Sequence, residues 1–352
     1  MEKILSIVIP AYNSGAFLNR VLDSLLEPSV LDYLDIIVVN DGSKDNTAEA
    51  AQGYCDRYPD SIRLINQENK GHGGALNTGI AAAVGKFVKV VDSDDWVETQ
   101  NLAPFVEQLR EIDSDVVLTH FTTHNIQDGS VTQWKSFPKS FRKVYSLQEL
   151  VDNWDSFNQV LAFHGIAYRT TFYHSTGVRL TEHVFYEDQE YATLPLCRAK
   201  AISALDLTIY DYRVGDANQS MSQANQLKNI RNYGIVLNRL LDEASRLPQV
   251  EESAQLDFFC LITKSFLTSY LMNIMLLGED RKQGRIQAAE LMDTVAEKLP
   301  LLYARTNVQY RALRVMSVFN VSKADCDKLL DSKFYNLLRH RHCMEVTTPE
   351  KK

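Results

Sequence analysis

The sequence has no pair of cysteines at the spacing of a disulfide framework or of a zinc site. Its five cysteines are odd in number and scattered over 352 residues, without a CxxC motif. This usage favours reduced thiols in the cytoplasm. Cations are also in the minority, because 37 lysines and arginines stand against 45 aspartates and glutamates. The acidic balance disfavours nucleic acid as a partner, since binding to its phosphates requires clustered positive charge.

Long hydrophobic runs are scarce as well. The N-terminal apolar run, residues 4–9, is too short for a signal peptide and is typical of a first strand. Residues 258–277 approach the length of a membrane span, but Lys264 lies near their middle. A central lysine costs about 3 kcal/mol on membrane insertion. We therefore expect a buried helix of a soluble protein at this position.

The first half of the chain alternates short apolar strands with helical patterns. Strands are expected at residues 4–9, 36–39, 62–65 and 87–91, and helices at residues 47–58 and 75–84. Continuous apolar strands separated by helices predict an α/β domain with a mostly parallel, Rossmann-like sheet that is covered on both faces. The polar residues 216–220 are the predicted junction, so this domain is expected to span residues 1–220.

The remaining residues, 221–352, are predicted to form an α-helical C-terminal domain. Apolar residues recur there at helical spacing through residues 227–244, 256–277, 286–299 and 303–318. This domain can cover the acceptor side, form an oligomer, or dock on a membrane or a protein partner. Residues 333–342 are basic with apolar residues interleaved, which fits either an ordinary surface helix or a helix on anionic lipid.

Polar side chains follow three of the predicted strands, and ligands of open α/β sheets bind at such carboxyl ends. Residues 10–13 follow the first strand, Asp41 lies in the polar run after the second, and residues 92–95 follow the strand that ends at residue 91. Alternation along an extended chain puts Asp92 and Asp94 on the same side. Two carboxylates there suit Mg²⁺ or Mn²⁺, although an Asx turn or a helix cap would use the same residues.

A glycine-rich stretch at residues 69–77 opens the helix expected at residues 75–84. Glycines permit close approach of the backbone, and a helix N-terminus favours anions. Lys70 and His72 can add positive charge beside a diphosphate, whereas the alternative is a plain turn before a helix. The stretch is neither a dinucleotide fingerprint after the first strand nor a P-loop.

Glu187 and Asp188 lie in a short acidic run beside aromatic residues. A carboxylate held in such a place can act as a general base. The same composition also fits the solvated start of a helix, where acidic residues favour the dipole.

Five segments, in this order, closely resemble the motifs of family 2 glycosyltransferases of the GT-A fold. They are residues 7–13, 39–45, 69–71, 91–95 and 186–188, and residues 210–213 with Ser220 are similar to the family's closing segment. The resemblance covers about residues 4–222. It implies a GT-A nucleotide-sugar-binding domain followed by the helical domain. The glutamine- and arginine-rich motif of processive synthases is missing, which favours transfer of a single sugar.

The resemblance implies a nucleotide-sugar site built from thirteen positions. They are Pro10, Ala11, Tyr12, Asn13, Asp41, Asn69, Lys70, Gly71, Gly74, Asp92, Ser93, Asp95 and Arg213. Asp41 would accept a hydrogen bond from a ring nitrogen of uracil. Asp95 would lie beside the donor sugar, and Arg213 would contact the diphosphate.

The resemblance also implies the catalytic groups. Asp94 would coordinate Mn²⁺ or Mg²⁺, and Asp92 would meet the ribose or a water on the metal. Asp188 would be the general base, with Glu187 as its neighbour. The implied activity is inverting transfer of a hexosyl or N-acetylhexosaminyl group from a nucleoside-diphosphate sugar, with UDP favoured. The acceptor would be a saccharide, glycolipid or glycoprotein in surface-glycan synthesis, at the cytoplasmic side or peripherally at the inner face of the plasma membrane.

Three other functions remain compatible with the residues. A nucleotidyltransferase that makes a nucleotide-sugar would share the metal site, but it should carry a basic glycine-rich loop after the first strand, and residues 10–14 are not such a loop. A non-catalytic nucleotide-sugar-binding assembly partner would be expected to have lost Asp92, Asp94 or Asp188, and all three are present. A nucleotide-sugar hydrolase would use the same donor site with water.

Overall fold

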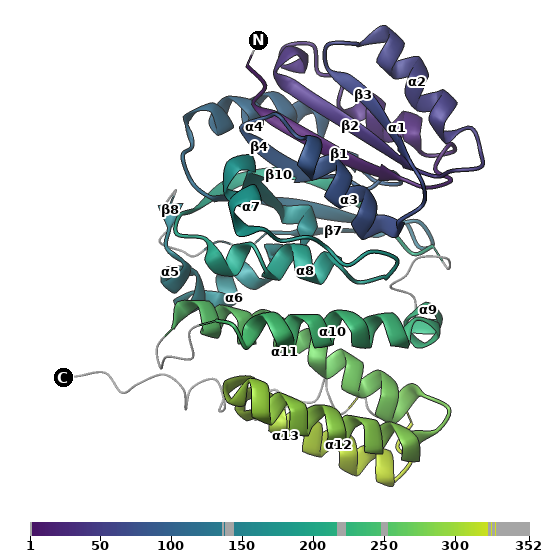
Figure 1. Cartoon of the computed structure of the whole chain (residues 1–352), viewed down its shortest axis with the longest axis vertical. Helices are drawn as coiled ribbons and strands as arrows, with labels where there is room; N and C mark the ends of the chain where they lie inside the picture. Colours follow the sequence, from purple (N-terminus) through teal and green to yellow (C-terminus); the bar gives the residue numbers. More distant parts are fainter. Residues whose placement is uncertain are drawn as a thin grey trace, which may run out of the picture. The chain divides into compact units, whose positions relative to one another are not determined.

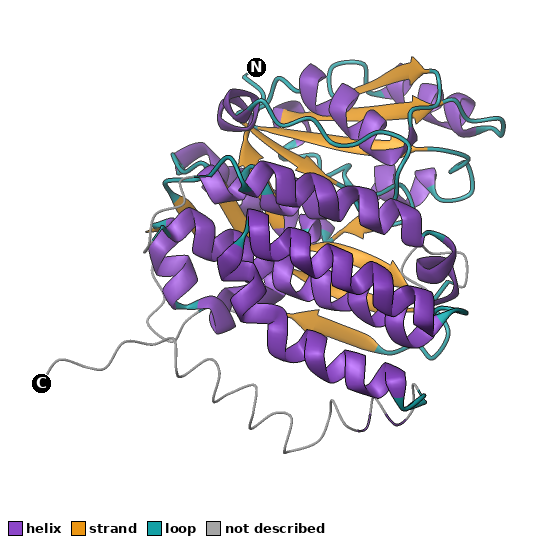
Figure 2. Cartoon of the chain, turned by 60° about the horizontal axis from the view of Figure 1, so that its bottom comes forward, coloured by secondary structure: helices purple, strands orange, loops and turns teal. Residues whose placement is uncertain are grey.

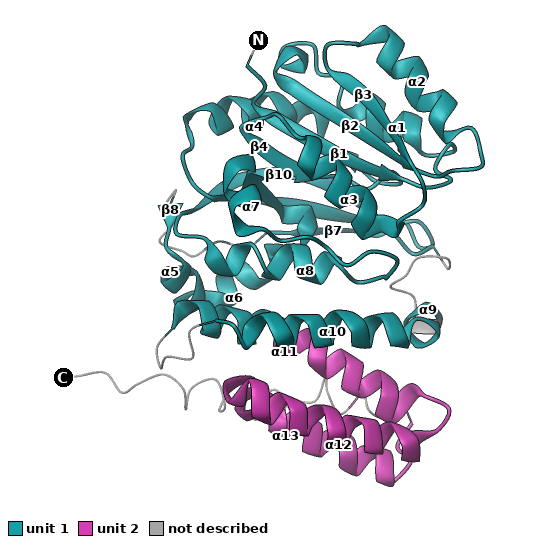
Figure 3. Cartoon of the chain, in the orientation of Figure 1, with its two compact units in different colours: residues 1–263 teal, residues 264–352 magenta. Residues whose placement is uncertain are grey.

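The structure is a computed structural model that describes residues 2–135, 137, 144–216, 223–247, 253–322, 325 and 328. The chain forms two compact units, residues 1–263 and residues 264–352 (Figure 3). Their boundary lies inside helix α11 (Ala254–Met272), later than the domain boundary expected at residues 220–221. That residues 1–220 carry the catalytic function and residues 221–352 serve the acceptor side, an oligomer or docking stays a prediction.

One sheet runs through the first unit, in the order β3-β2-β1-β4-β9-β6-β10-β5, with β7 paired to β6 and β8 to β10 (Figure 1). The strands are β1 (Leu5–Ala11), β2 (Leu34–Asp41), β3 (Ile62–Gln67), β4 (Phe87–Val90), β5 (Trp96–Val97), β6 (Val116–Asn125), β7 (Val131–Trp134), β8 (Val144–Tyr145), β9 (Ile166–Arg169) and β10 (Ile202–Val214). The pairs β1–β2, β2–β3, β1–β4 and β6–β10 are parallel, whereas β9 is antiparallel to both β4 and β6. The predicted mostly parallel sheet is confirmed.

Helices surround the strands in the first unit and form the regular structure of the described chain after β10, as the purple ribbons of Figure 2 show. They are α1 (Leu18–Ser24), α2 (Thr47–Arg57), α3 (Gly71–Ala82), α4 (Thr99–Glu111), α5 (Leu147–Asp152), α6 (Trp154–Phe157), α7 (Thr170–Thr176), α8 (Asp188–Thr193), α9 (Gln223–Lys228), α10 (Ile230–Ala244), α11, the π-helical turn η5 (Asn273–Leu277), α12 (Arg281–Lys298) and α13 (Pro300–Val318). The predicted C-terminal helices are confirmed.

The parallel strands place their carboxyl ends together. Every residue of β1 and β2 is buried, which requires cover on both faces of the sheet. Because β1, β2, β3 and β4 run in one direction, the segments that follow Ala11, Asp41, Gln67 and Val90 leave the sheet at one edge. This geometry puts the polar residues of the sequence motifs side by side.

Helix α3 begins at Gly71, earlier than the helix predicted at residues 75–84. The glycine-rich stretch is therefore the first turn of the helix and not a turn that precedes it. Gly71 has the positive φ of 74°, a conformation that favours glycine, and the chain enters the helix through it. The prediction failed because glycine-rich sequences carry a low intrinsic helix propensity.

The second unit packs η5, α12 and α13 against one another. Ser317 of α13 donates a hydrogen bond to the carbonyl oxygen of Met275 at 2.7 Å, and Arg285 of α12 donates to Oγ of Ser317 at 3.0 Å. Residues Ala254–Leu277 are long and apolar enough to cross a membrane by length and composition alone, and 56% of their most apolar window is buried inside the structure. Such burial also occurs in the core helix of a soluble protein.

Some of the sequence-based expectations fall on residues outside the described ranges. The basic segment 333–342, most of the junction at residues 216–220, and Cys326 and Cys343 are among them. Cys55, Cys197 and Cys260, which the structure describes, are buried and form no disulfide with each other.

Helix α3 lies directly on β1 and β2, and Gly79 makes this approach possible (Figure 1). A Cβ atom at Gly79 would lie 3.1 Å from Cγ2 of Val39 and closer still to Cγ1 of Val8. The position therefore has no room for a methyl group, and the C-terminal half of α3 packs closely on β1 and β2.

We expect Gly79→Ala to lower the free energy of unfolding by about 1–3 kcal/mol, because the added methyl group overpacks the contact of α3 with the sheet. The matched control is Gly53→Ala in α2, where nothing lies within 4 Å of the added Cβ. There alanine should stabilise by up to about 1 kcal/mol through its helix propensity. Urea unfolding followed by tryptophan fluorescence measures both, since all 3 tryptophans belong to the first unit. Equal effects of the two substitutions would contradict the close packing.

Candidate active site

A cleft of about 450 Å³ opens at the carboxyl ends of the parallel strands. Nine residues expected in the site line it, namely Pro10, Ala11, Tyr12, Asp41, Asn69, Gly71, Asp92, Ser93 and Asp94. His72, expected beside a diphosphate, also lines it, and five residues that were not expected there complete the wall, namely Ser14, Ala75, His183, Val184 and Phe185. The structure thus brings together segments that lie far apart in the sequence.

Asp41, at the end of β2, is a fixed acceptor at the base of the cleft. Its Oδ1 accepts hydrogen bonds from the backbone amide of Lys70 at 2.8 Å and from Nε2 of Gln67 at 2.7 Å. Oδ2 accepts none from the part of the chain that the structure describes. Because the carboxyl group is buried and oriented through one oxygen, the other can accept a hydrogen bond from a ligand.

The loop after β1 is fixed by Asn13, which does not line the cleft. Asn13 adopts a positive φ of 51°. Its amide donates to Oγ of Ser43 at 3.0 Å, and its Oδ1 accepts from the amide of Lys44 at 2.9 Å. These bonds tie the loop after β1 to the loop after β2, while Tyr12 is 52% exposed and lines the cleft.

The first turn of α3 supplies backbone amides to the cleft, since the first amides of a helix have no partner inside it. Lys70 precedes the helix, and its carbonyl oxygen accepts from the amide of His183 at 2.9 Å. A Cβ atom at Gly74 would collide with Cβ of Lys70, so this turn packs tightly on its own entry. Lys70 and Gly74 pack against each other and do not line the cleft.

Asp92, Asp94 and Asp95 form an acidic cluster in which one carboxylate oxygen of each residue lies within 4.8 Å of the others. Burial, followed by the charge of Asp92, raises the pKa of Asp94 above its ordinary value. Such crowding of carboxylates raises their pKa values unless a positive charge compensates for it. The donor set consists of carboxylate oxygens, which Mg²⁺ and Mn²⁺ prefer, so these residues fit a divalent cation.

Both carboxylate oxygens of Asp95 accept hydrogen bonds from other residues of the protein. Its Oδ2 accepts from the hydroxyl of Tyr210 at 2.5 Å, and its Oδ1 accepts from the amide of Arg213 at 2.8 Å. Burial, and then Asp92 and Asp94, raise its pKa well above the ordinary value. Asp95 is buried and does not line the cleft, so Asp92 and Asp94 are the members of the cluster that face it. Its role beside the donor sugar stays a prediction.

Arg213 lies next to the acidic cluster, near the end of β10. Its Nη1 is 3.9 Å from Oδ2 of Asp94, and its Nη2 donates to Oδ2 of Asp216 at 3.0 Å. The guanidinium group offsets part of the negative charge of the cluster. Arg213 is not among the lining residues of the cleft, and its contact with a diphosphate stays a prediction.

His72 joins the two acidic groups of the site. Its Nε2 lies 2.9 Å from Oδ1 of Asp92, and its Nδ1 contacts Oε1 of Glu187. Burial alone would lower the pKa of His72, but the charges of Asp92 and Glu187 outweigh it and hold that pKa well above the ordinary value. His72 is therefore a cation between two carboxylates, and its charge is already paired within the protein.

Glu187 ends the loop at residues 181–187, and Asp188 is the first residue of α8. Glu187 is buried, and Asp188 is partly exposed. Burial, and then the charge of Glu187, raise the pKa of Asp188 to about 7, although His72 acts in the opposite direction. A carboxyl group with this pKa can hold or release a proton near neutral pH, which a general base requires.

Some of the lining residues that were missed carried a local signal. The run from His183 to Phe185 is separated from the acidic pair by Tyr186 alone, so it lies beside residues that the sequence had already singled out. Ser14 carried no such signal, because its hydroxyl meets that of Ser93 at 2.7 Å across a sequence separation of 79 residues. Contacts of this kind depend on the fold.

Comparisons with known proteins agree with this geometry. Residues 6–173 match the family model described as Glycosyl transferase family 2. The chain is 34% identical to glycosyltransferase GlyG of Streptococcus pneumoniae over 131 residues, which are 37% of this chain and 43% of GlyG. It is 27% identical to the uncharacterized glycosyltransferase YibD of Escherichia coli, over 69% of this chain and 71% of YibD. The match thus spans less than half the length of GlyG.

Among solved structures, residues 1–349 of Staphylococcus aureus TarS share the fold. The TM-score is 0.64 at 20% identity, and the alignment covers 89% of this chain and 90% of that one. A second structure of the same TarS segment is a complex with UDP-GlcNAc. The match of residues 6–173 to the family model assigns this part of the chain to glycosyl transferase family 2, and the similarity to TarS shows that the chain has the GT-A fold.

Proposed function

We propose that this chain is an inverting glycosyltransferase that moves one sugar from a UDP-sugar to a hydroxyl group of an acceptor. The observation that carries the proposal is the contact of His72 with Asp92 on one side and Glu187 on the other. It joins the cleft that fits a nucleotide and a cation to the carboxyl pair that can remove a proton. A transferase needs both parts, whereas a nucleotide-binding partner needs only the cleft.

Asp41 is proposed to select the nucleotide. Its Oδ1 is held by Lys70 and Gln67, so Oδ2 can accept from the ring N–H of uracil while Tyr12 packs on the base. The similar fold of TarS, which has been solved with UDP-GlcNAc, makes this compound the first donor to test. The transferred group is thus proposed to be a hexosyl or N-acetylhexosaminyl group.

Asp92 and Asp94 are proposed to hold Mg²⁺ or Mn²⁺. The bound cation would offset the negative charge that develops on the departing diphosphate. The amides at the start of α3 can stabilise the same charge as hydrogen-bond donors.

Asp188 is proposed as the general base. It takes the proton from the acceptor hydroxyl while that oxygen bonds to the anomeric carbon and the bond from this carbon to the diphosphate breaks. The displacement occurs in one step, so the configuration inverts and no covalent enzyme intermediate forms. Glu187, held by His72, keeps the start of α8 in place.

We further propose that the reaction serves the synthesis of a surface polysaccharide, a glycolipid or a glycoprotein glycan at the cytoplasmic side. The acceptor would then lie near the inner face of the plasma membrane, where residues 333–342 can contact anionic lipid.

Calorimetric titration with UDP, GDP and dTDP, each with Mn²⁺ or with EDTA, tests the donor site. We expect UDP to bind and Mn²⁺ to increase its affinity, because Asp41 can accept from the ring N–H of uracil and Asp92 and Asp94 can bind the cation. Thymine and guanine also carry a ring N–H, so the comparison with dTDP and GDP decides which base the cleft prefers. Asp94→Asn should lose most of the gain from Mn²⁺ and keep the affinity in EDTA. The control is Asp113→Asn, whose carboxylate is 86% exposed. No binding of any nucleotide would contradict the donor site.

The pH dependence of turnover tests the general base. The base acts only when ionised, and the pKa of Asp188 is raised to about 7. We therefore expect kcat/KM, which reports the free enzyme, to fall about tenfold per pH unit below this value and to level off above it. Asp188→Asn should lower kcat by about 10²–10⁴-fold and leave UDP binding intact.

The matched control for this variant is Asp206→Asn, because the Asp206 side chain is 80% exposed and pairs with His120. It should keep the turnover of the natural sequence. Full turnover in Asp188→Asn would remove Asp188 as the base. Nucleotide binding without transfer in the unsubstituted chain would favour a non-catalytic binding partner.

Liposome flotation tests the proposed membrane contact. The full chain should float with vesicles that contain anionic lipid, and a chain that ends at residue 332 should not, because it lacks the basic residues after this point. Vesicles of neutral lipid serve as the control. Equal flotation of the two chains would exclude residues 333–352 as the contact.

A further inference from the structure

Hydrogen bonds join the two ends of the segment that carries the proposed base. Glu190 of α8 is fully buried, and its two carboxylate oxygens accept from the amide of Thr181 at 2.8 Å and from its hydroxyl at 2.6 Å. These two bonds join the ends of the segment 181–190. Between them lie His183, Val184 and Phe185 of the cleft wall and the acidic pair Glu187 and Asp188.

The segment holds an unfavourable conformation. His183 and Tyr186 have positive φ angles of 58° and 74°, which non-glycine residues adopt only at a cost. Such residues persist where their surroundings fix the backbone. On one side this support is α3, because a Cβ at Gly73 would collide with the carbonyl oxygen of Thr181 and lie 2.9 Å from Cγ of Glu187.

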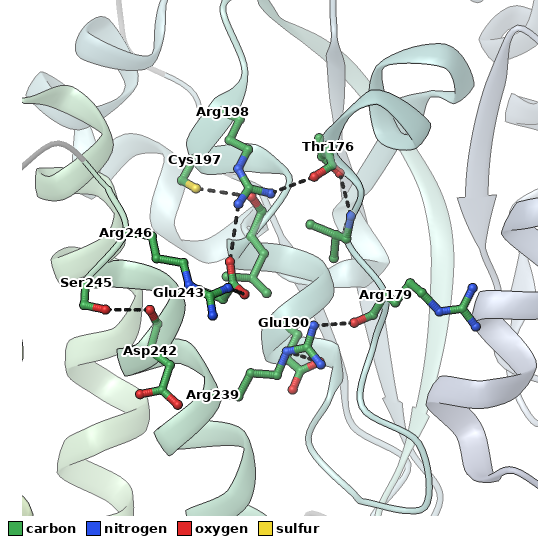
Figure 4. Close-up of polar contacts among 12 residues, drawn as sticks. Thr176, Arg179, Glu190, Cys197, Arg198, Arg239, Asp242, Glu243, Ser245 and Arg246 are labelled. Carbon is green, nitrogen blue, oxygen red and sulfur yellow. Dashed lines mark hydrogen bonds and ion pairs between the residues drawn. The ribbon is translucent and has the colours of Figure 1, made fainter.

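Arg239 of α10 supports the segment from the other side (Figure 4). Its Nη2 donates to the carbonyl oxygen of Arg179 at 2.6 Å, and its Nη1 donates to Oγ of Thr181 at 3.2 Å. Its Nε lies 3.7 Å from Oε2 of Glu190. Within the described chain, Arg239 is the cation that faces this buried carboxylate, and an ionised carboxylate in such a place needs a partner.

We propose that Arg239 is a positioning residue that holds the loop 181–190, and with it Asp188, in the geometry for proton removal. The proposal rests on the function proposed for Asp188. Arg239 does not line the cleft, so it acts through Thr181 and Glu190 and not by touching a substrate. Both the loop and α10 lie beyond residues 6–173, the part of the chain that matches the family model.

A neighbouring ion pair provides a matched control. Arg198, in the short turn η4 (Leu196–Arg198), lies 3.5 Å from Glu243 of α10 and donates to the carbonyl oxygen of Thr176 at 3.2 Å (Figure 4). Its side chain is 32% exposed, close to the 33% of Arg239. Arg198 therefore fastens the same helix to the same unit but does not bond to the loop 181–190.

The test compares Arg239→Gln with Arg198→Gln by steady-state kinetics with UDP-GlcNAc and by hydrogen exchange. We expect Arg239→Gln to lower kcat by about 10–100-fold with little change in the donor KM, because a small displacement of a catalytic group has such effects. The amides of residues 181–188 should exchange faster. Arg198→Gln should keep both kcat and the slow exchange.

Arg239→Lys is the second variant. If Arg239→Gln does not fold, kcat and hydrogen exchange are compared between Arg239→Lys and Arg198→Gln. Lysine keeps the charge beside Glu190 but cannot reproduce the planar fork, so it should restore kcat in part. If the two glutamine variants behave alike in kcat and in exchange, Arg239 only fastens α10 and the proposal is wrong. If the unsubstituted chain transfers no sugar, the proposed function fails, and the exchange of residues 181–188 still decides whether Arg239 orders the loop.

Discussion

The site depends on how negative charge is balanced where the parallel strands end. The carboxyl groups of Asp92, Asp94, Asp95, Glu187 and Asp188 gather near one edge of the sheet, and unrelieved repulsion would open it. The repulsion is reduced in two ways. A charged His72 lies between Asp92 and Glu187, and the pKa values of the other three carboxyl groups are raised. As a result, Asp188 has a pKa near neutrality, whereas Asp92 and Asp94 face the cleft. Charge compensation thus assigns different chemistry to side chains of the same kind.

Strand β10, late in the sequence, contributes to this charge balance through its contacts with Asp95. It contributes the hydroxyl of Tyr210 and the amide of Arg213, which occupy both oxygens of Asp95 across separations of 115 and 118 residues. Asp95 in turn fixes the turn that carries Asp92 and Asp94. The order of the cluster therefore depends on residues far beyond the motif itself, and β10 can reach it only because β9 and β6 extend the sheet toward it.

The sequence was sufficient for the parts of the fold that depend on local pattern. Apolar strands with polar ends located Asp41 and the run from Asp92 to Asp95 correctly at one edge, because the direction of parallel strands decides where their ends lie. It was insufficient for long-range pairing. The antiparallel strand β9 is too short to stand out, and His72 was expected beside a diphosphate although it contacts Asp92 and Glu187. Nothing local in Arg239 indicates a partner at Glu190, since ion pairs between helices follow from packing.

The loop 181–190 is held by elements on both of its sides, and both belong to the first unit. A loop with left-handed residues at His183 and Tyr186 stores conformational free energy, and it keeps one shape only when contacts on both sides supply more than that cost. Helix α3 supplies one side, and α10 supplies the other through Arg239. A unit that ended with the sheet would leave this loop supported on one side. The compact unit continues past β10 to residue 263 and so includes α10, a helix outside the cleft that contacts its acidic wall.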